Sequence, residues 1–123
     1  MAIIPYTQTS LPEPGNPFVW VVQWGPMQNG DIGAPITDLY SYSDRSMQVE
    51  GTFGAGGACT LEGSNDKVNF RTLSDPQGVA LVVTTGSIKE VTELALTNRP
   101  HITAGDGTTA LTVTMILRKT KGI

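Results

Sequence analysis

Residues 109–117, TALTVTMIL, follow the pattern that decides the fold class. Every second position is apolar, and these positions hold Leu111, Val113, Met115 and Leu117. The intervening positions hold alanine, two threonines and isoleucine, and β-branched residues such as threonine suit a pleated, half-buried surface. Because successive side chains of a strand point to opposite faces of its sheet, the stretch predicts a β-strand with one face in a hydrophobic core.

The same period of two marks two earlier stretches. FVWVVQW (18–24) places Trp20 and Trp24 on one side of a strand whose other side is also largely apolar. SMQVEGTF (46–53) alternates apolar with polar residues, as a half-buried antiparallel strand does. We expect the first strand to have both faces covered and the second to have one face in water.

Turn signals separate these stretches from further short candidate strands. DPQG (75–78) has proline second and glycine fourth, as a type I turn prefers, and GSND (63–66) is rich in turn residues. Residues 88–96 fit either a strand or a short helix. The chain thus contains about eight predicted strands, at 18–23, 36–42, 47–53, 58–62, 68–73, 79–84, 101–104 and 109–117, with a further candidate at 88–96.

Many short strands with turns between them predict an all-β fold. We expect a jelly roll, or more generally a two-sheet antiparallel β sandwich of about eight strands, formed by a single domain over residues 18–123.

Residues 1–17 predict a different kind of structure, an extended N-terminal arm. Four prolines in this segment remove backbone donors and favour extended geometry over a helix. A disordered N-terminus is the alternative for the isolated chain. In an assembly, we expect the arm to dock on a neighbour through its apolar side chains, Ile3, Ile4, Tyr6 and Leu11.

The composition favours a protein that packs against partners over an enzyme. Charged residues make up 15% of the 123 residues, against roughly 25% in an average soluble domain. The surface is therefore expected to be rich in neutral side chains. We also expect a chain that is not exported by the usual route and spans no membrane, because it lacks a signal-peptide pattern and a long apolar run.

Catalytic and metal-binding groups are scarce in the sequence. The single cysteine, Cys59, is predicted to be a buried or half-buried strand thiol, and the single histidine, His101, has no neighbouring donors at ligand spacing. The paired acids Glu90 with Glu93 and Glu62 with Asp66 are expected to be solvated. The sequence therefore predicts no catalytic residue, no cofactor and no metal site.

Charge is distributed unevenly along the chain. Residues 1–98 hold four basic and ten acidic side chains, a net charge of −6, whereas residues 99–123 have a net charge of +3. The tail residues Arg118, Lys119 and Lys121 could contact an acidic neighbour or simply keep the end of the last strand solvated. Their small number and the absence of interleaved aromatics argue against nucleic-acid binding.

Three segments resemble a family of known proteins. VEGTF (49–53), CTLEGSNDKVNFRTLSDPQG (59–78) and RPHITAGDGTTALTVTMIL (99–117) resemble, in order and spacing, small β-rich structural proteins of tailed bacteriophages, especially capsid decoration or cement proteins. The resemblance covers residues 47–117 and leaves out the proline-rich arm.

The resemblance implies a jelly-roll protein that binds the outside of an assembled icosahedral shell and bridges neighbouring subunits. Its expected partners are the major capsid protein and itself, with a homodimer favoured over a trimer. It would be made in the host cytoplasm and reside on the capsid exterior of the virion. In such a protein Trp20 and Trp24 would be core or dimer contacts.

A second hypothesis comes from a different class of protein. The EGSND turn followed by FRTL (70–73) is also similar to a hairpin of discoidin-like carbohydrate-binding domains, which are usually longer than this chain. The alternative function is therefore a carbohydrate-binding or tail-associated host-recognition β-sandwich module that uses exposed aromatic side chains.

Overall fold

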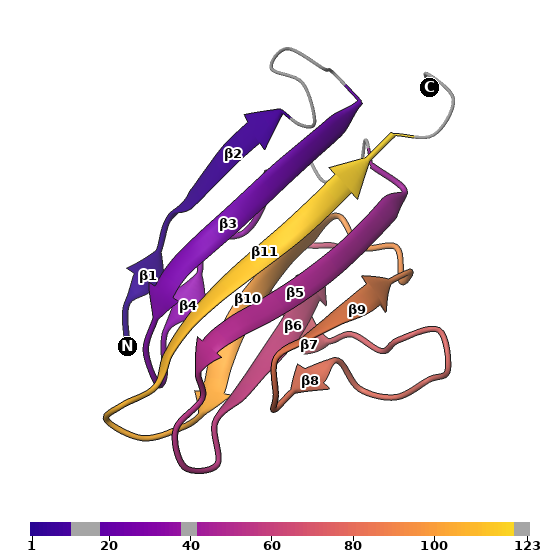
Figure 1. Ribbon diagram of the computed structural model, residues 1–123. Coiled ribbons are helices and arrows are strands. Elements are labelled where there is room, and N and C mark those ends of the chain that lie inside the picture. Colours follow the sequence, from indigo (N-terminus) through magenta and orange to yellow (C-terminus); the bar gives the residue numbers. More distant parts are fainter. Residues whose placement is uncertain (11–17, 38–41, 120–123) are drawn as a thin grey trace.

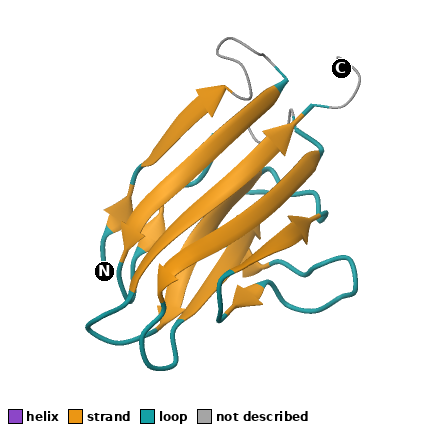
Figure 2. Ribbon diagram, viewed as in Figure 1, coloured by secondary structure: helices purple, strands orange, loops and turns teal. Residues whose placement is uncertain are grey.

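The computed structural model describes residues 1–10, 18–37 and 42–119 of the chain. Within these ranges the regular structure consists of eleven β-strands in two sheets and includes no helix (Figure 2). This confirms the predicted all-β class and agrees with a two-sheet sandwich. None of these residues forms a helix long and apolar enough to cross a membrane.

The five-stranded sheet is built around the last strand of the chain. Its order is β2-β3-β11-β5-β9, and every neighbouring pair is antiparallel. The central strand β11 contains the stretch that predicted the fold class, and its neighbours come from distant parts of the sequence (Figure 1). The bounds are β2 (Tyr6–Ser10), β3 (Val19–Met27), β11 (Ala110–Arg118), β5 (Asp44–Thr52) and β9 (Ser87–Val91).

The six-stranded sheet faces the first one across the core. Its order is β1-β4-β10-β6-β7, with β8 also paired to β6, and the β1–β4 pair is parallel. The long strands β10 and β6 form its centre, while its other strands are two residues long. The bounds are β1 (Ile3–Ile4), β4 (Ile32–Gly33), β10 (Thr97–Ala104), β6 (Ala58–Ser64), β7 (Arg71–Thr72) and β8 (Val82–Val83).

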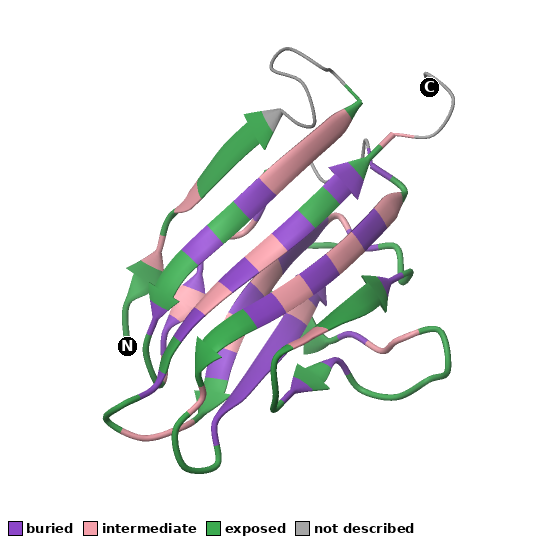
Figure 3. Cartoon of the chain, viewed as in Figure 1, coloured by how far each residue is buried: buried purple, intermediate pink, exposed green. Residues whose placement is uncertain are grey.

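The hydrophobic core lies between the inner faces of the two sheets. Burial alternates along β11 and β5 with the predicted period of two (Figure 3). From the six-stranded sheet, Cys59, Leu61 and Ile102 enter the same core cluster. The five-stranded sheet contributes Val22, Trp24, Met47, Val49 and the four apolar residues of β11, Leu111, Val113, Met115 and Leu117.

Three predicted strands differ from the structure, and one of them, at 79–84, is reduced to β8 (Val82–Val83). The prediction at 36–42 is wrong at its described positions, Ile36, Thr37 and Tyr42, which lie outside any strand, and the strand in this region is β4. The predicted strand at 68–73 shrinks to β7, and Val68 is 78% exposed. The reason is local: the Asp66 carboxylate accepts the backbone N–H groups of Val68 and of the next residue, which bends the chain into a loop.

Residues 88–96 could have formed a strand or a helix; residues 88–91 belong to strand β9 (Ser87–Val91), and residues 92–96 lie in neither kind of element. The DPQG turn is also present, because the backbone N–H of Gly78 donates to the carbonyl of Asp75 at 2.9 Å. The position of this turn was therefore predicted correctly from its proline and glycine residues.

The N-terminal segment differs from the predicted arm over its first ten residues. β1 lies at the edge of the six-stranded sheet and β2 at the edge of the five-stranded sheet, so the chain changes sheets at Pro5 (Figure 1). The segment is extended, but it pairs with the chain's own β4 and β3. Residues 11–17, the rest of the predicted arm, lie outside the described residues.

Candidate functional site

The outer face of the five-stranded sheet is an uncovered surface of the protein. No described strand or loop lies over this face (Figure 1). The strand register aligns outward side chains in rows, and one row runs across all five strands. That row consists of Thr7, Gln23, Thr114, Gln48 and Ile88.

This outer face is neutral on β2 and β3, whereas β11, β5 and β9 each add charged side chains to it, namely Arg118, Asp44, Glu50 and Glu90. A second row, two residues further along, begins with Thr9 and Val21 and continues through Ile116 and Ser46 to Glu90. Gln23 donates its side-chain N–H to the hydroxyl of Thr114 at 3.1 Å, so even the polar groups are partly paired within the face. The neutral part of this face can be covered by a partner with little loss of charge hydration.

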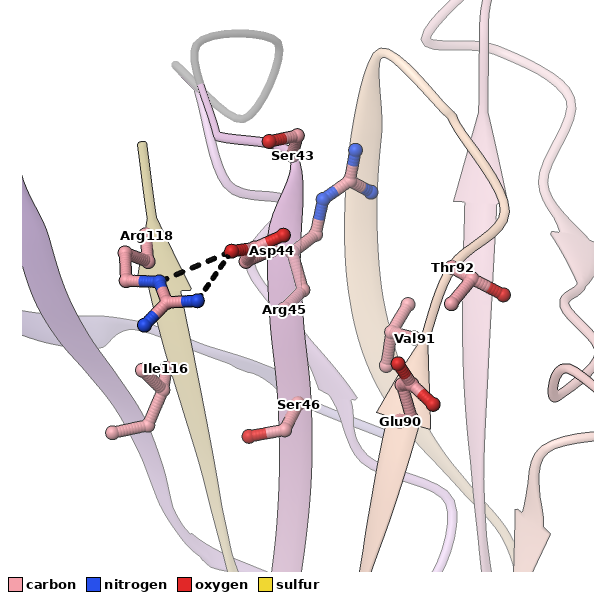
Figure 4. Close-up of a pocket in the computed structure, with 9 residues that line it drawn as sticks. All are labelled: Ser43, Asp44, Arg45, Ser46, Glu90, Val91, Thr92, Ile116 and Arg118. Atoms are coloured by element: carbon pink, nitrogen blue, oxygen red, sulfur yellow. Dashed lines mark hydrogen bonds and ion pairs between the residues drawn. The ribbon is translucent and has the colours of Figure 1, made fainter. Parts of the chain in front are cut away.

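A hollow of about 390 Å³ lies at one end of this face, between β11, β5 and β9 (Figure 4). Ile116 supplies an apolar part of its lining, and Ser46 and Glu90 supply polar groups. Arg118 reaches across from β11 to Asp44 on β5, with which it is paired in the strand register. Both Nε and Nη2 of Arg118 donate to Oδ2 of Asp44, at 3.0 and 2.7 Å.

The predicted basic tail is only partly available for an electrostatic contact. The Arg118–Asp44 pair is solvent-exposed, with side-chain exposures of 61% and 41%, so it contributes little to stability. The guanidinium of Arg118 nevertheless already has a carboxylate partner within the chain. Lys119 places its Nζ atom 5.5 Å from the centre of the Tyr42 ring, and Lys121 lies outside the described residues.

The predicted aromatic contacts lie on the inner side of the five-stranded sheet. Trp24 is fully buried, and its indole N–H donates to the carbonyl of Ala34 at 3.0 Å. Tyr6 packs edge-on against it, with ring centres 5.7 Å apart, and Trp20 is half-buried against the core. Trp24 is therefore a core residue.

The predicted arm contacts are divided between core and surface. Ile4 and Tyr6 pack against the hydrophobic core, whereas Ile3 is 58% exposed. Ile3 pairs with Ile32 in the parallel β1–β4 ladder. Leu11 lies outside the described residues.

A polar cluster on the outer face of the six-stranded sheet was missed by the sequence predictions. Glu62 on β6 accepts from Arg99 Nε at 2.9 Å and makes a 3.0 Å hydrogen bond with His101 Nδ1, both from β10. Arg99 also stacks over the Phe70 ring, with its Cζ atom 3.7 Å from the ring centre. In the sequence, the only indication of this cluster is that Arg99 and His101 are two residues apart and so lie on the same face of a strand. That spacing indicates a cluster only when the strand register, which places Glu62 opposite Arg99, is known.

The structure corrects the prediction that Glu62 is solvated, since its side chain is only 14% exposed. Burial alone would raise the pKa of Glu62. Hydrogen bonds from His101 and Arg99, together with their charge, outweigh burial and hold the pKa of Glu62 below its ordinary value. Because the carboxylate is held by two basic side chains, it ties β6 to β10 and is not a free general base.

Cys59 and the possible metal-ligating side chains form no reactive site among the described residues. Burial raises the pKa of the Cys59 thiol to about 12, and the predicted burial of this side chain is confirmed. Over the described ranges, no three His, Cys, Asp or Glu side chains are grouped so that they could hold a metal ion.

No protein-family model matches the chain, and no curated protein matches it. Function is therefore inferred from the strand order and the outer faces.

Proposed function

We propose that this chain is a virion structural protein that binds the outside of an assembled phage capsid and cements neighbouring major capsid subunits. The observation that carries the proposal is the strand order. From β3 to β6 the chain alternates between the two sheets, and after β7 and β8 it alternates again from β9 to β11. In each sheet an early strand lies beside a late one, β3 beside β11 and β4 beside β10.

This arrangement is the one expected of an eight-stranded jelly roll made of two Greek keys. In that interpretation β3, β11, β5 and β9 form one sheet, and β4, β10 and β6 form the other together with β7 and β8. β1 and β2 are additions at the edges of the two sheets. Jelly rolls occur in viral capsid and lectin domains, which supports both the leading hypothesis and its alternative.

The outer face of the five-stranded sheet is the proposed docking surface. Three strands of nine residues and two of five present roughly 600 Å² to a flat partner, from ordinary strand spacing and rise, which is somewhat below the ~800 Å² per partner of a standard interface. On β2 and β3 and in the middle of β11, the outward side chains are mainly neutral threonine, glutamine and valine, which can be buried without loss of charge hydration, whereas Glu50 and Glu90 lie on the side of β5 and β9.

Attachment of this kind would stabilise the shell by mass action. A protein that binds assembled subunits and not dissociated ones adds its binding free energy to the cost of opening the shell. Many bound copies add up the modest binding free energy of each contact. A protein that acts in this way needs no catalytic group. The protein would be made in the host cytoplasm and act on the capsid exterior.

Substitutions at Thr114 test the docking surface. Thr114→Lys places a charge at the centre of the proposed interface, and we expect attachment to purified particles to fall by about tenfold or more, as loss of one central contact does. Thr72→Lys, on β7 of the other sheet, is the matched control and should attach normally. Electron cryo-microscopy of the particles should show regularly spaced copies on the shell.

Copies confined to the tail would contradict the capsid proposal, and so would equal attachment of the two variants. Both variants should first be shown to unfold at the temperature of the unmodified protein, so that a loss of attachment reports the surface.

The alternative function, a carbohydrate-binding or tail-associated host-recognition module, is favoured by the hollow beside Asp44. A small-ligand site combines polar groups with an apolar patch. Here Ser46 and Glu90 provide the polar groups, and Ile116 provides the apolar patch. Glycan binding should then shift the amide NMR signals of these residues and be weakened by Glu90→Gln. A broad glycan panel that shifts none of these signals would exclude it.

A further inference from the structure

Strand β2 has an open edge. It pairs with β3 through Tyr6–Trp24 to Ser10–Trp20, and no described strand lies on its other side (Figure 1). An edge strand presents a row of N–H and C=O groups that its own sheet does not pair. Such a row can be completed by another extended chain.

The other edges of the two sheets are protected in ways that β2 is not. β1, β7 and β8 are two residues long, and short edge strands offer little to pair with. β9 is as long as β2 but contains Lys89 and Glu90, and charges on an edge discourage pairing. β2 has the sequence YTQTS, with no charge and no proline inside it.

We propose that β2 pairs antiparallel with β2 of a second copy of this chain, about a two-fold axis at Gln8. This register places Thr7 opposite Thr9 of the partner subunit and Gln8 opposite its own counterpart. Thr–Thr pairs and facing amides can hydrogen-bond across strands. The same symmetric pairing at β9 would place Lys89 opposite Lys89, which is unfavourable.

The two-fold axis makes the interface self-complementary and closed, as in most homodimers. The two five-stranded sheets become one continuous sheet of ten strands. Because an axis between antiparallel strands of one sheet is perpendicular to that sheet, both outer faces point to the same side. The dimer does not depend on capsid attachment, but it would present two docking surfaces to one flat partner.

Charge substitutions at Gln8 test both the strand and the symmetry. Gln8 is exposed, so Gln8→Lys and Gln8→Glu should each leave the melting temperature of the dilute, monomeric protein unchanged. In either variant two like charges face each other across the axis, and self-association should weaken by roughly five-fold or more. An equimolar mixture of the two variants should dimerise at least as well as the unmodified chain, measured by sedimentation equilibrium.

Ile88→Lys on β9 is the matched control, because Ile88 is also an exposed edge-strand residue. It should leave self-association unchanged. A second measurement needs no variant: amide hydrogen exchange within residues 6–10 should slow as the concentration of the unmodified protein rises.

Three results would overturn the proposal. They are a chain that stays monomeric at every soluble concentration, a mixture of the Gln8 variants that does not restore association, and loss of association in Ile88→Lys equal to that in Gln8→Lys. Dimerisation without particle binding would overturn the proposed function and leave the dimer standing.

Discussion

Asp106 shows how one exposed carboxylate organises a loop. It accepts the hydroxyl of Thr108 at 2.6 Å and the backbone N–H groups of Ala55 and Thr108, both at 2.9 Å. The hydroxyl of Thr108 is the largest influence, and these hydrogen bonds lower the pKa of Asp106 from 3.8 to about 2. The side chain therefore links the loop after β5 to the loop before β11.

This lowered pKa makes the stability of the protein depend on pH. The carboxylate is favoured in the folded state, so its contribution is present above pH 3.8 and is lost as the pH falls from 3.8 to about 2. Asp106→Asn removes that contribution. We therefore expect its free energy of unfolding, measured by urea titration, to fall less steeply over this range than that of the unmodified protein.

Asp75→Asn is a suitable control, because Asp75 also accepts backbone N–H groups in a turn. A profile for Asp106→Asn that keeps the full acid slope of the unmodified protein would contradict the assignment.

At the scale of single residues, the sequence predicted which positions enter the core better than which polar groups meet. The apolar set of β11 follows directly from a period of two. The contact of Glu62 with Arg99 and His101 depends on the pairing of β6 with β10 across 37 and 39 residues, which no local pattern contains. Burial of Trp24 was one of two alternatives that the sequence left open.

Gly33 on β4 shows that a two-residue strand can be tightly constrained by its neighbours. A Cβ atom at this position would lie 2.6 Å from the Pro100 ring and 2.8 Å from Cδ1 of Trp24. Both neighbours are buried, so neither can move away easily. The absence of a side chain lets β4 pass close to β10 and β3.

Gly33→Ala should therefore lower the free energy of unfolding by about 2 kcal/mol through overpacking. Gly107→Ala is the matched control, because no atom lies within 4 Å of the corresponding Cβ position. Chemical denaturation of both variants provides the measurement. Equal stabilities would mean that the close approach at Gly33 is relaxed at little cost.

At the scale of elements, long alternating strands were predictable and short paired ones were not. β11, β5 and β3 carry their own periodicity and were placed within a few residues of their observed bounds. β1 and β4 are two residues each and exist because they pair with each other and, for β4, with β10. The prolines near β2 favoured an extended arm in the prediction. The residues between the prolines nevertheless pair with the sheets, and proline content alone does not reveal such pairing.

Cys59 provides a probe of the whole molecule. Its side chain is fully buried between the sheets, and burial raises its pKa to about 12. A thiol reagent therefore reaches it only when the sandwich opens.

Labelling of Cys59 at neutral pH should be at least 1,000-fold slower in the folded protein than in urea, given the usual free energies of opening. The labelling rate should rise with denaturant in parallel with global unfolding. Rapid labelling of the folded protein would mean that β6 opens locally.

The position of β11 also constrains how the protein can be assembled during synthesis. Every other described strand is made before β11, yet β11 alone joins β3 to β5. A nascent chain that has reached residue 109 therefore lacks the strand that joins β3 to β5. The five-stranded sheet can close only after residue 118 has left the ribosome, and a chain stopped before β11 leaves the facing sides of β3 and β5 open to other chains.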